Sequence, residues 1–180
     1  EIWQIILYYI ILLCAVYMAK RCHNRMKVLG AGLFLMVLTM SIKSSYDFQV
    51  HMIDVGQGDS IYINADKLNM LFDGGSSDIN QVGEYRIYPF LKSKGVSSLD
   101  YVFISHSDSD HINGIIELIE MQDSSFRITT VVMPDISLEF KDDNYKELVD
   151  KAKQAGVRVL YANAGNICLN SNKLNITCLS

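Results

Sequence analysis

Four side chains of the types that bind divalent cations lie in one short stretch, at His106, Asp108, Asp110 and His111. Most of the residues between them are serines, which keep the stretch compact. In an extended segment, alternate residues point the same way at spacings of about 6–7 Å, and a turn would gather them on a shared cation. Imidazole nitrogen together with carboxylate oxygen is a ligand set for Zn²⁺ or Mn²⁺, not for a thiolate site.

The simplest alternative is a solvated polar loop without a chemical role, because Ser and Asp are common in loops. Two features favour the metal site. Asp110 is followed directly by His111, and His106 comes just after the apolar run 101–104. Such a run is typical of a strand buried on both faces, and active-site loops of α/β folds follow the carboxyl ends of strands.

The elements that must position this loop begin as strands and continue as strands alternating with helices. The apolar periodicity predicts strands at 48–53, 60–64, 68–72, 101–104, 128–133, 157–160 and 174–178. Helices are predicted at 84–94, 112–121 and 144–155. This order predicts an α/β sheet with helices on its outer faces.

Two uncharged apolar segments, residues 2–19 and 28–42, precede these elements. As a helix, the first would span roughly 27 Å, close to the hydrocarbon core of about 30 Å. The second is shorter and needs Ser44 and Ser45 to extend it. The alternative is a signal peptide followed by a buried core helix, but no basic region precedes the first segment and no cleavage site follows it. We therefore predict two transmembrane helices in a region of residues 1–45, which contact membrane lipid.

The distribution of basic residues predicts the orientation of these helices. The loop 20–27 carries four Lys or Arg, whereas only Lys43 follows the second segment closely. The positive-inside rule then places the loop in the cytoplasm. We predict a multi-pass protein of the cell membrane, with residues 46–180 on the extracytoplasmic side.

The region 46–180 is acidic, with 11 Lys or Arg against 19 Asp or Glu, a formal charge of −8. This balance argues against a broad nucleic-acid-binding face and suits a domain that concentrates carboxylates around cations. The four cysteines show no CxxC spacing. Cys168 and Cys178 could face each other across a strand pair outside the cell, but ordinary buried thiols explain them equally well.

Several motifs resemble those of a known family. The stretch Ser105–Gly114 is similar to the H-x-H/D-x-D-H signature of the metallo-β-lactamase fold, and Leu71–Gly75 resembles the strand-end Asp motif of the same superfamily. Met52–Ser60, Leu91–Gly95 and Leu99–His106 resemble the C-terminal hydrolase domain of ComEC-type competence proteins. The resemblance covers about residues 46–180. It implies the N-terminal half of an αββα sandwich behind transmembrane helices.

By position, the resemblance implies two divalent ions, Zn²⁺ or Mn²⁺. His106 and Asp108 would hold the first ion, with Asp108 standing where many relatives have a second His. Asp110 and His111 would hold the second, and Asp110 would also act catalytically by orienting a bridging hydroxide. Asp73 would support the loop from behind the ligands.

Asp54 and Asp59 flank a Gly-rich turn that the resemblance places near the site mouth. A supporting role there and a plain turn role are equally compatible with their positions. We expect no catalytic role for His51, which lies in mid-strand, or for His23, which belongs to the basic loop.

The sequence departs from the family pattern at two points. Asn113-Gly114 replaces the more usual Gly-Gly, a change that we expect the fold to tolerate. No His follows His111, although the superfamily draws its remaining ligands from the second half of the sandwich. We therefore expect the chain to be a fragment that is inactive by itself.

The leading hypothesis is a metal-dependent hydrolase domain of a membrane DNA-uptake protein, a phosphodiesterase or nuclease acting on DNA outside the membrane. DNA and other competence machinery as partners follow from the resemblance alone. One alternative is a metallo-hydrolase of a small ester, lactone or cyclic nucleotide. Another is a non-catalytic element of a DNA translocation channel.

Overall fold

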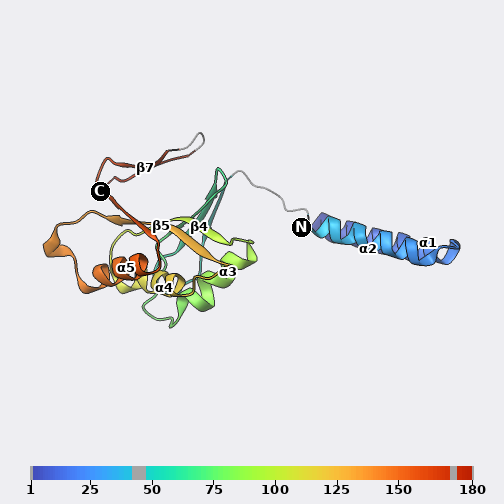
Figure 1. The fold of residues 1–180 in the computed structure, drawn as a ribbon, viewed down its shortest axis with the longest axis horizontal. Coiled ribbons are helices and arrows are strands. Elements are labelled where there is room, and N and C mark those ends of the chain that lie inside the picture. Colours follow the sequence, from blue (N-terminus) through green and yellow to red (C-terminus); the bar gives the residue numbers. More distant parts are fainter. Residues whose placement is uncertain (1, 42–47, 171–173, 180) are drawn as a thin grey trace. The chain divides into compact units, whose positions relative to one another are not determined.

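A computed structural model describes residues 2–41, 48–170 and 174–179. The chain divides into two compact units, Glu1–Tyr46 and Asp47–Ser180 (Figure 1). We describe each unit by itself.

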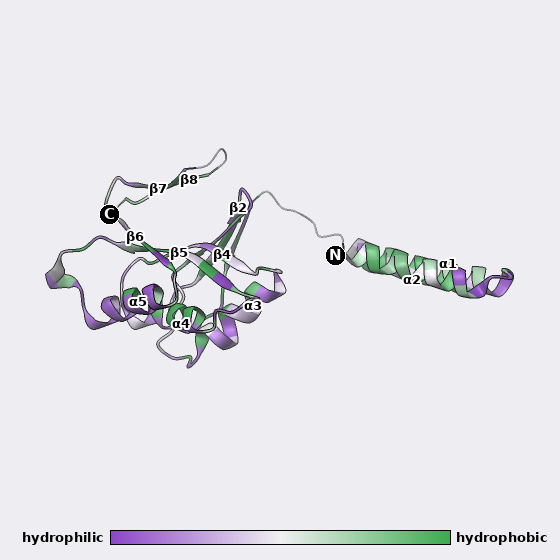
Figure 2. Cartoon of the chain, in the orientation of Figure 1, coloured by the Kyte–Doolittle hydropathy of each residue, from purple (hydrophilic) through white to green (hydrophobic). Residues whose placement is uncertain are grey.

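The first unit is a pair of packed helices, α1 (Ile2–Arg21) and α2 (Arg25–Ser41). They approach closely where small residues meet, because a Cβ atom added to Gly32 would lie only 2.6 Å from the Cβ atom of Ala15. Most of their large apolar side chains are exposed, such as Leu13, Phe34 and Met40. Figure 2 shows hydrophobic residues along both helices and hydrophilic residues gathered where the two helices join.

Among the described residues, α1 is long and apolar enough to cross a membrane, over Trp3–Arg21. The second helix has 17 residues, which span about 26 Å, and Arg25 and Lys27 lie in its first turn. The structure therefore does not support the prediction of two transmembrane helices. Ser44 and Ser45, which were expected to extend the second helix, lie outside the described residues.

The second unit is built on a six-stranded mixed sheet whose spatial order is the chain order. Its strands are β1 (Phe48–Met52), β2 (Ile61–Ala65), β3 (Leu68–Phe72), β4 (Ser98–Phe103), β5 (Arg127–Pro134) and β6 (Arg158–Ala162). The first three strands pair antiparallel through short connections, and β3 to β6 pair parallel through helical crossovers. The predicted strands of the sheet are confirmed, with ends shifted by up to three residues.

Helices cover one face of this sheet (Figure 1). They are a π-helical turn (Gly83–Ile87) that runs into α3 (Tyr88–Ser93), then α4 (Ser109–Glu120) and α5 (Asp143–Gln154). A short 3₁₀ turn, Leu138–Phe140, precedes α5. The predicted helix 84–94 is therefore two pieces with different windings. The core of this face includes Leu71, Leu91, Leu99, Ile115 and Leu148, all fully buried.

The other face of the sheet carries a hairpin of β7 (Ile167–Asn170) and β8 (Asn175–Thr177). Leu169 and Ile176 of this hairpin pack on a second cluster, centred on Met70, Phe103 and Val132. The prediction of an α/β sheet with helices outside it is confirmed, and the described helices occupy one face of that sheet. The strand β7 was not predicted, because its four residues are too short to show a clear alternation.

Candidate metal centre

The site forms where β3 and β4 end side by side. These strands are parallel neighbours, so their carboxyl ends lie at the same edge of the sheet. The backbone N–H of Asp73 donates to the carbonyl oxygen of Phe103 at 2.9 Å, which extends the ladder by one more bond. Asp73 is thereby fixed beside the loop that follows β4.

Asp73 has an unusual backbone and a fully engaged side chain. It is buried and has a φ angle of +52°, in the left-handed region that few residues other than glycine adopt. Its Oδ1 atom accepts the N–H of Ser105 at 2.8 Å. Its Oδ2 atom accepts the hydroxyl of Ser105 at 2.7 Å and contacts Nδ1 of His111 at 3.1 Å. Strained backbone at such a position is typical of functional sites.

These bonds determine which ring nitrogen of each histidine carries the proton. A carboxylate oxygen only accepts, so Nδ1 of His111 donates to Asp73. The Ser105 hydroxyl donates its one hydrogen to Asp73. Its oxygen, 2.9 Å from Nδ1 of His106, therefore accepts a hydrogen bond from that nitrogen. In the neutral form of each ring, the lone pair is then on Nε2. Asp73 sets the two tautomers, directly for His111 and through Ser105 for His106.

The Nε2 atoms face carboxylates. Nε2 of His106 lies 3.5 Å from Oδ2 of Asp108, and Nε2 of His111 lies 3.9 Å from Oδ2 of Asp110 and 4.0 Å from Oδ2 of Asp59. The two imidazole rings are 3.8 Å apart between centroids. His111 is 12 % exposed, whereas the Asp108 side chain is 70 % exposed, so the cluster opens to solvent on the Asp108 side.

This donor set fits a divalent cation. A lone pair and a carboxylate that face each other repel unless a positive charge lies between them. The separations of 3.5–4.0 Å approach the spacing of two ligands on one tetrahedral ion, about 3.4 Å for bonds of about 2.1 Å. As the side chains are placed, no three His, Cys, Asp or Glu side chains within the described ranges meet closely enough to hold an ion. The residue types therefore fit a divalent cation, whereas the side chains would have to rotate to bring three of them onto one ion.

Two glycines let three backbone segments meet behind this cluster. A Cβ atom on Gly58 would lie 2.6 Å from the carbonyl oxygen of Asp110, and one on Gly75 would lie 2.6 Å from the same oxygen. Any side chain at either position would push the Gly-rich turn or the segment after β3 away from the start of α4. Glycine is needed here for this close approach, which brings Asp59 next to His111.

The two aspartates of the Gly-rich turn have different surroundings. Asp59 lies beside His111, as described above. Asp54 points away from the cluster: its side chain is 86 % exposed, and it pairs with Arg86 at 3.7 Å. Its Oδ1 atom accepts the N–H of Gly56 at 3.4 Å, as a turn residue does. His51 stacks against Tyr62 in the sheet, away from the site loop.

The start of α4 differs from the expected extended loop. The helix begins at Ser109, so Asp110 and His111 lie in its first turn and only residues up to Asp108 are extended. Asp108 is the N-cap residue, yet its side chain makes no capping hydrogen bond in the described structure. Its carboxylate is therefore not committed to the helix and can turn towards His106.

Three supporting residues were missed from the sequence. The hydroxyl of Ser107, which is buried, donates to Oδ2 of Asp142 at 3.0 Å, and the other carboxylate oxygen of Asp142 caps α5. The loop is thereby tied to the next helix. The side chain of Asn113 exchanges two hydrogen bonds with the backbone of Ser76, at 2.9 and 2.6 Å. Nothing in the sequence pattern indicates these partners, because each pair is more than 30 residues apart.

Comparison with known proteins shows what part of this sequence is similar to. Residues 53–125 match the model of the metallo-beta-lactamase superfamily. The chain is 27 % identical over 175 residues to ComE operon protein 3 of Bacillus subtilis. This match covers 87 % of this chain and 22 % of that protein. It is 41 % identical over 61 residues to Competence protein ComA of Neisseria gonorrhoeae, covering 34 % and 8 % of the two chains.

A third relative is Recombination protein 2 of Haemophilus influenzae, 32 % identical over 98 residues, with 51 % of this chain and 12 % of that protein covered. The chain thus spans about a fifth of the length of the first relative and less of the others. The match and the relatives confirm the resemblance drawn from the motifs. Residues 53–125 thus match the metallo-beta-lactamase superfamily, and the chain is similar in sequence to these competence proteins.

Proposed function

We propose that the second unit is the metal-dependent hydrolase domain of a DNA-uptake protein and that it cleaves phosphodiester bonds. One observation carries the proposal. Asp73 and Ser105 engage Nδ1 of His111 and of His106, so that the Nε2 atoms of both rings face carboxylates at 3.5–4.0 Å, an arrangement that a cation between them would stabilise.

In this proposal, His106 and Asp108 hold one divalent ion and Asp110 and His111 hold a second, either Zn²⁺ or Mn²⁺. Such ions lower the pKa of bound water and stabilise negative charge on a phosphoryl oxygen. Asp110 would also orient the attacking water, because it lies in the first turn of α4 and is 39 % exposed, within reach of solvent and of a substrate. Asp59 adds a further carboxylate beside His111.

DNA as the substrate is supported by the relatives, two of which carry competence or recombination in their names. The domain itself is acidic, so bound cations would have to offset its repulsion of phosphate. The alternatives remain a hydrolase of a small ester, lactone or cyclic nucleotide and a non-catalytic channel element, and the assay below separates them.

We also propose that the pair α1–α2 is embedded in the membrane and that the second unit lies outside the cytoplasm. The support is the exposed apolar surface of both helices, together with the basic residues that join them. We propose further that the second unit is the first half of an αββα sandwich. The support is the apolar face of the sheet under β7–β8, because such a face can pack against a second sheet.

The test uses the full-length parent protein, purified in detergent. Plasmid DNA, single-stranded oligonucleotide, a cyclic dinucleotide and a small ester are incubated with Mn²⁺ or Zn²⁺, with and without chelator. We expect metal-dependent cleavage of DNA that His111→Ala and Asp110→Ala abolish and that the matched change His51→Ala leaves intact. Cleavage of the small substrates alone would favour the second hydrolase hypothesis. If the unaltered protein bound metal but cleaved none of the substrates, the hypothesis of a non-catalytic channel element would be favoured.

A further inference from the structure

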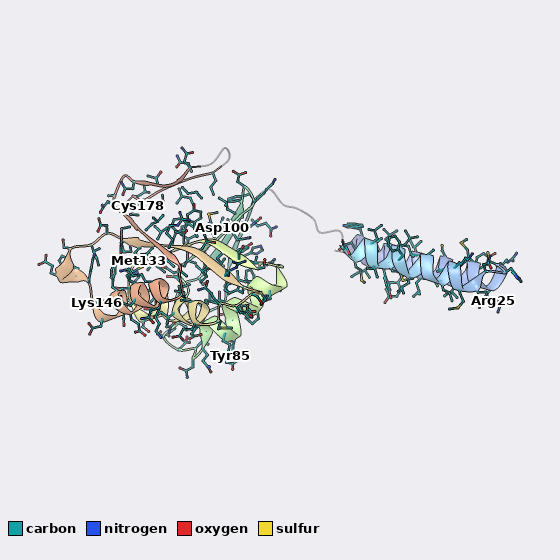
Figure 3. All side chains as sticks on the ribbon, in the orientation of Figure 1. Arg25, Tyr85, Asp100, Met133, Lys146 and Cys178 are labelled. Atoms are coloured by element: carbon teal, nitrogen blue, oxygen red, sulfur yellow. The ribbon has the colours of Figure 1, made fainter. Side chains whose placement is uncertain are left out.

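The hairpin β7–β8 carries two cysteines, Cys168 and Cys178, ten residues apart in the chain and both partly buried. The other two cysteines, Cys14 and Cys22, belong to the helical unit. Figure 3 labels Cys178 on the hairpin side of the sheet, whereas Lys146 of α5 lies on the helix side.

Both cysteines line one cavity of about 270 Å³ between the hairpin and the sheet. The same cavity is lined by Phe103 and Met133 of the sheet and extends to Asp73 and Ser105 of the candidate metal centre. Both cysteines thus line the hairpin end of a space whose other end is lined by residues of the site.

The pairing of the two strands brings the sulfur of Cys168 close to the Cys178 backbone. Ile167 pairs with Thr177, but Leu169 pairs with Ile176, so Cys168 is the extra residue of a β-bulge. The carbonyl oxygen of Asn166 accepts the N–H of Cys178 at 2.9 Å and lies 3.9 Å from Sγ of Cys168. The backbone N–H of Cys178 and the sulfur of Cys168 are therefore both close to the carbonyl oxygen of Asn166.

A disulfide requires Cα atoms within about 7 Å of each other. Diagonal neighbours in a regular antiparallel ladder are about 7–8 Å apart, so a small adjustment at the bulge is enough. We propose that Cys168 and Cys178 form a disulfide under oxidising conditions and that this bond joins the two strands of the hairpin beside the cavity.

The bond forms by thiol–disulfide exchange with an oxidised small-molecule disulfide. Burial raises the pKa of the Cys168 thiol, which lowers the fraction of this thiol present as thiolate. The Cys178 thiolate attacks one sulfur of oxidised glutathione and releases one glutathione thiolate. The Cys168 thiolate then attacks the Cys178 sulfur of the mixed disulfide and releases the second glutathione. Two protein thiols are oxidised and one glutathione disulfide is reduced to two thiols.

The test uses the whole chain in detergent, incubated with oxidised glutathione, acid-quenched and treated with a maleimide. Trypsin cleaves after Arg158 and after Lys173, so Cys168 and Cys178 fall in separate peptides, 159–173 and 174–180. We expect a disulfide-linked pair of these peptides that separates on reduction, and a fall from four maleimide-reactive thiols to two.

The matched variants decide the pairing. The linked peptides should be lost in Cys168→Ser and in Cys178→Ser, and should persist in the double variant Cys14→Ser/Cys22→Ser. If Cys168 and Cys178 instead carry maleimide or glutathione on separate peptides, or link to Cys14 or Cys22, the proposal is overturned. The result is independent of any hydrolase activity.

Discussion

At the scale of single residues, Asp73 orders both histidines of the site. It binds His111 directly and His106 through the Ser105 hydroxyl. Its oxygens accept three hydrogen bonds from these neighbours, at 2.7–3.1 Å, so the carboxylate has little freedom to turn. An exposed carboxylate could not hold two rings in this way.

The change Asp73→Asn tests this role. Asparagine also tolerates the left-handed backbone conformation, so the strain is unchanged and the protein should fold. Its amide can donate where the carboxylate accepted, which disturbs the tautomers of the histidines. We expect zinc affinity to fall about 10- to 100-fold, measured by calorimetric titration. The exposed Asp54→Asn is the matched control, and an equal loss in both variants would contradict the role of Asp73.

Sequence reasoning predicted the residue types of the site better than their supports. The adjacency of Asp110 and His111 after an apolar strand was a local signal. The hydrogen bonds from Ser105 to Asp73 and from Ser107 to Asp142 could not be predicted from the sequence. They depend on side-chain directions and on segments brought together from distant parts of the chain. The grouping of the four proposed ligands around metal remains a prediction.

At the scale of elements, the Gly-rich turn, the segment after β3 and the start of α4 are held together by close backbone contact. Replacing Gly75 with Ala would force its Cβ atom against the Asp110 carbonyl. We expect a loss of about 1–3 kcal/mol in the free energy of unfolding, measured by urea titration, because overpacking costs this much. Gly30→Ala, where nothing lies within 4 Å, is the control and should lose no stability. A Gly75→Ala variant as stable as the wild type would contradict the close packing.

Asp78 connects two of these elements and makes their stability depend on pH. It accepts the Gln57 N–H and the Ser76 hydroxyl, both at 2.8 Å, and these bonds lower the pKa of its carboxyl below the ordinary value of 3.8. Because the folded-state pKa is depressed, the stabilisation is present above pH 3.8 and is lost as pH falls through the folded pKa.

The stability difference between the wild type and Asp78→Asn should therefore shrink below pH 3.8, measured by thermal unfolding across pH 2–6. A difference that stays constant over this range would mean that the charge of Asp78 has no part in holding the turn.

Element types were predicted well where the apolar periodicity was long, as in α4 and α5. The errors were at boundaries and special geometry. The first turn of α4 includes Asp110 because Asp108 serves as N-cap, and the π-helical turn before α3 has the same apolar spacing as an ordinary helix. Of the hairpin, β8 was predicted and β7 was not, because β7 is short and a bulge interrupts its alternation of apolar and polar residues.

At the scale of the whole molecule, α1 and α2 expose many large apolar side chains, whereas hydrophobic and hydrophilic residues alternate along the elements of the second unit (Figure 2). In the sequence, the first unit ends at Tyr46 and the second begins at Asp47, next to the composition shift. The start of α2 could not be predicted from the uncharged segment 28–42, because the helix begins three residues earlier and includes the charged residues Arg25 and Lys27.

The proposed membrane orientation predicts the result of reporter fusions. A phosphatase that is active only outside the cytoplasm should be active when fused after Ser180, and a reporter active only in the cytoplasm should be inactive there. Replacing the basic residues Lys20, Arg21, Arg25 and Lys27 by Gln should weaken this asymmetry, because they carry the orientation signal. A cytoplasmic signal from the unaltered chain would contradict the orientation.

Cation binding at the paired histidines can be observed residue by residue, because the chain has only four histidines. In a zinc titration followed by NMR of the imidazole rings, the signals of His106 and His111 should shift together and saturate, while those of His51, stacked on Tyr62 in the sheet, should stay unchanged. Signals of His106 and His111 that do not respond to zinc, or respond no more than those of His51, would contradict the metal centre.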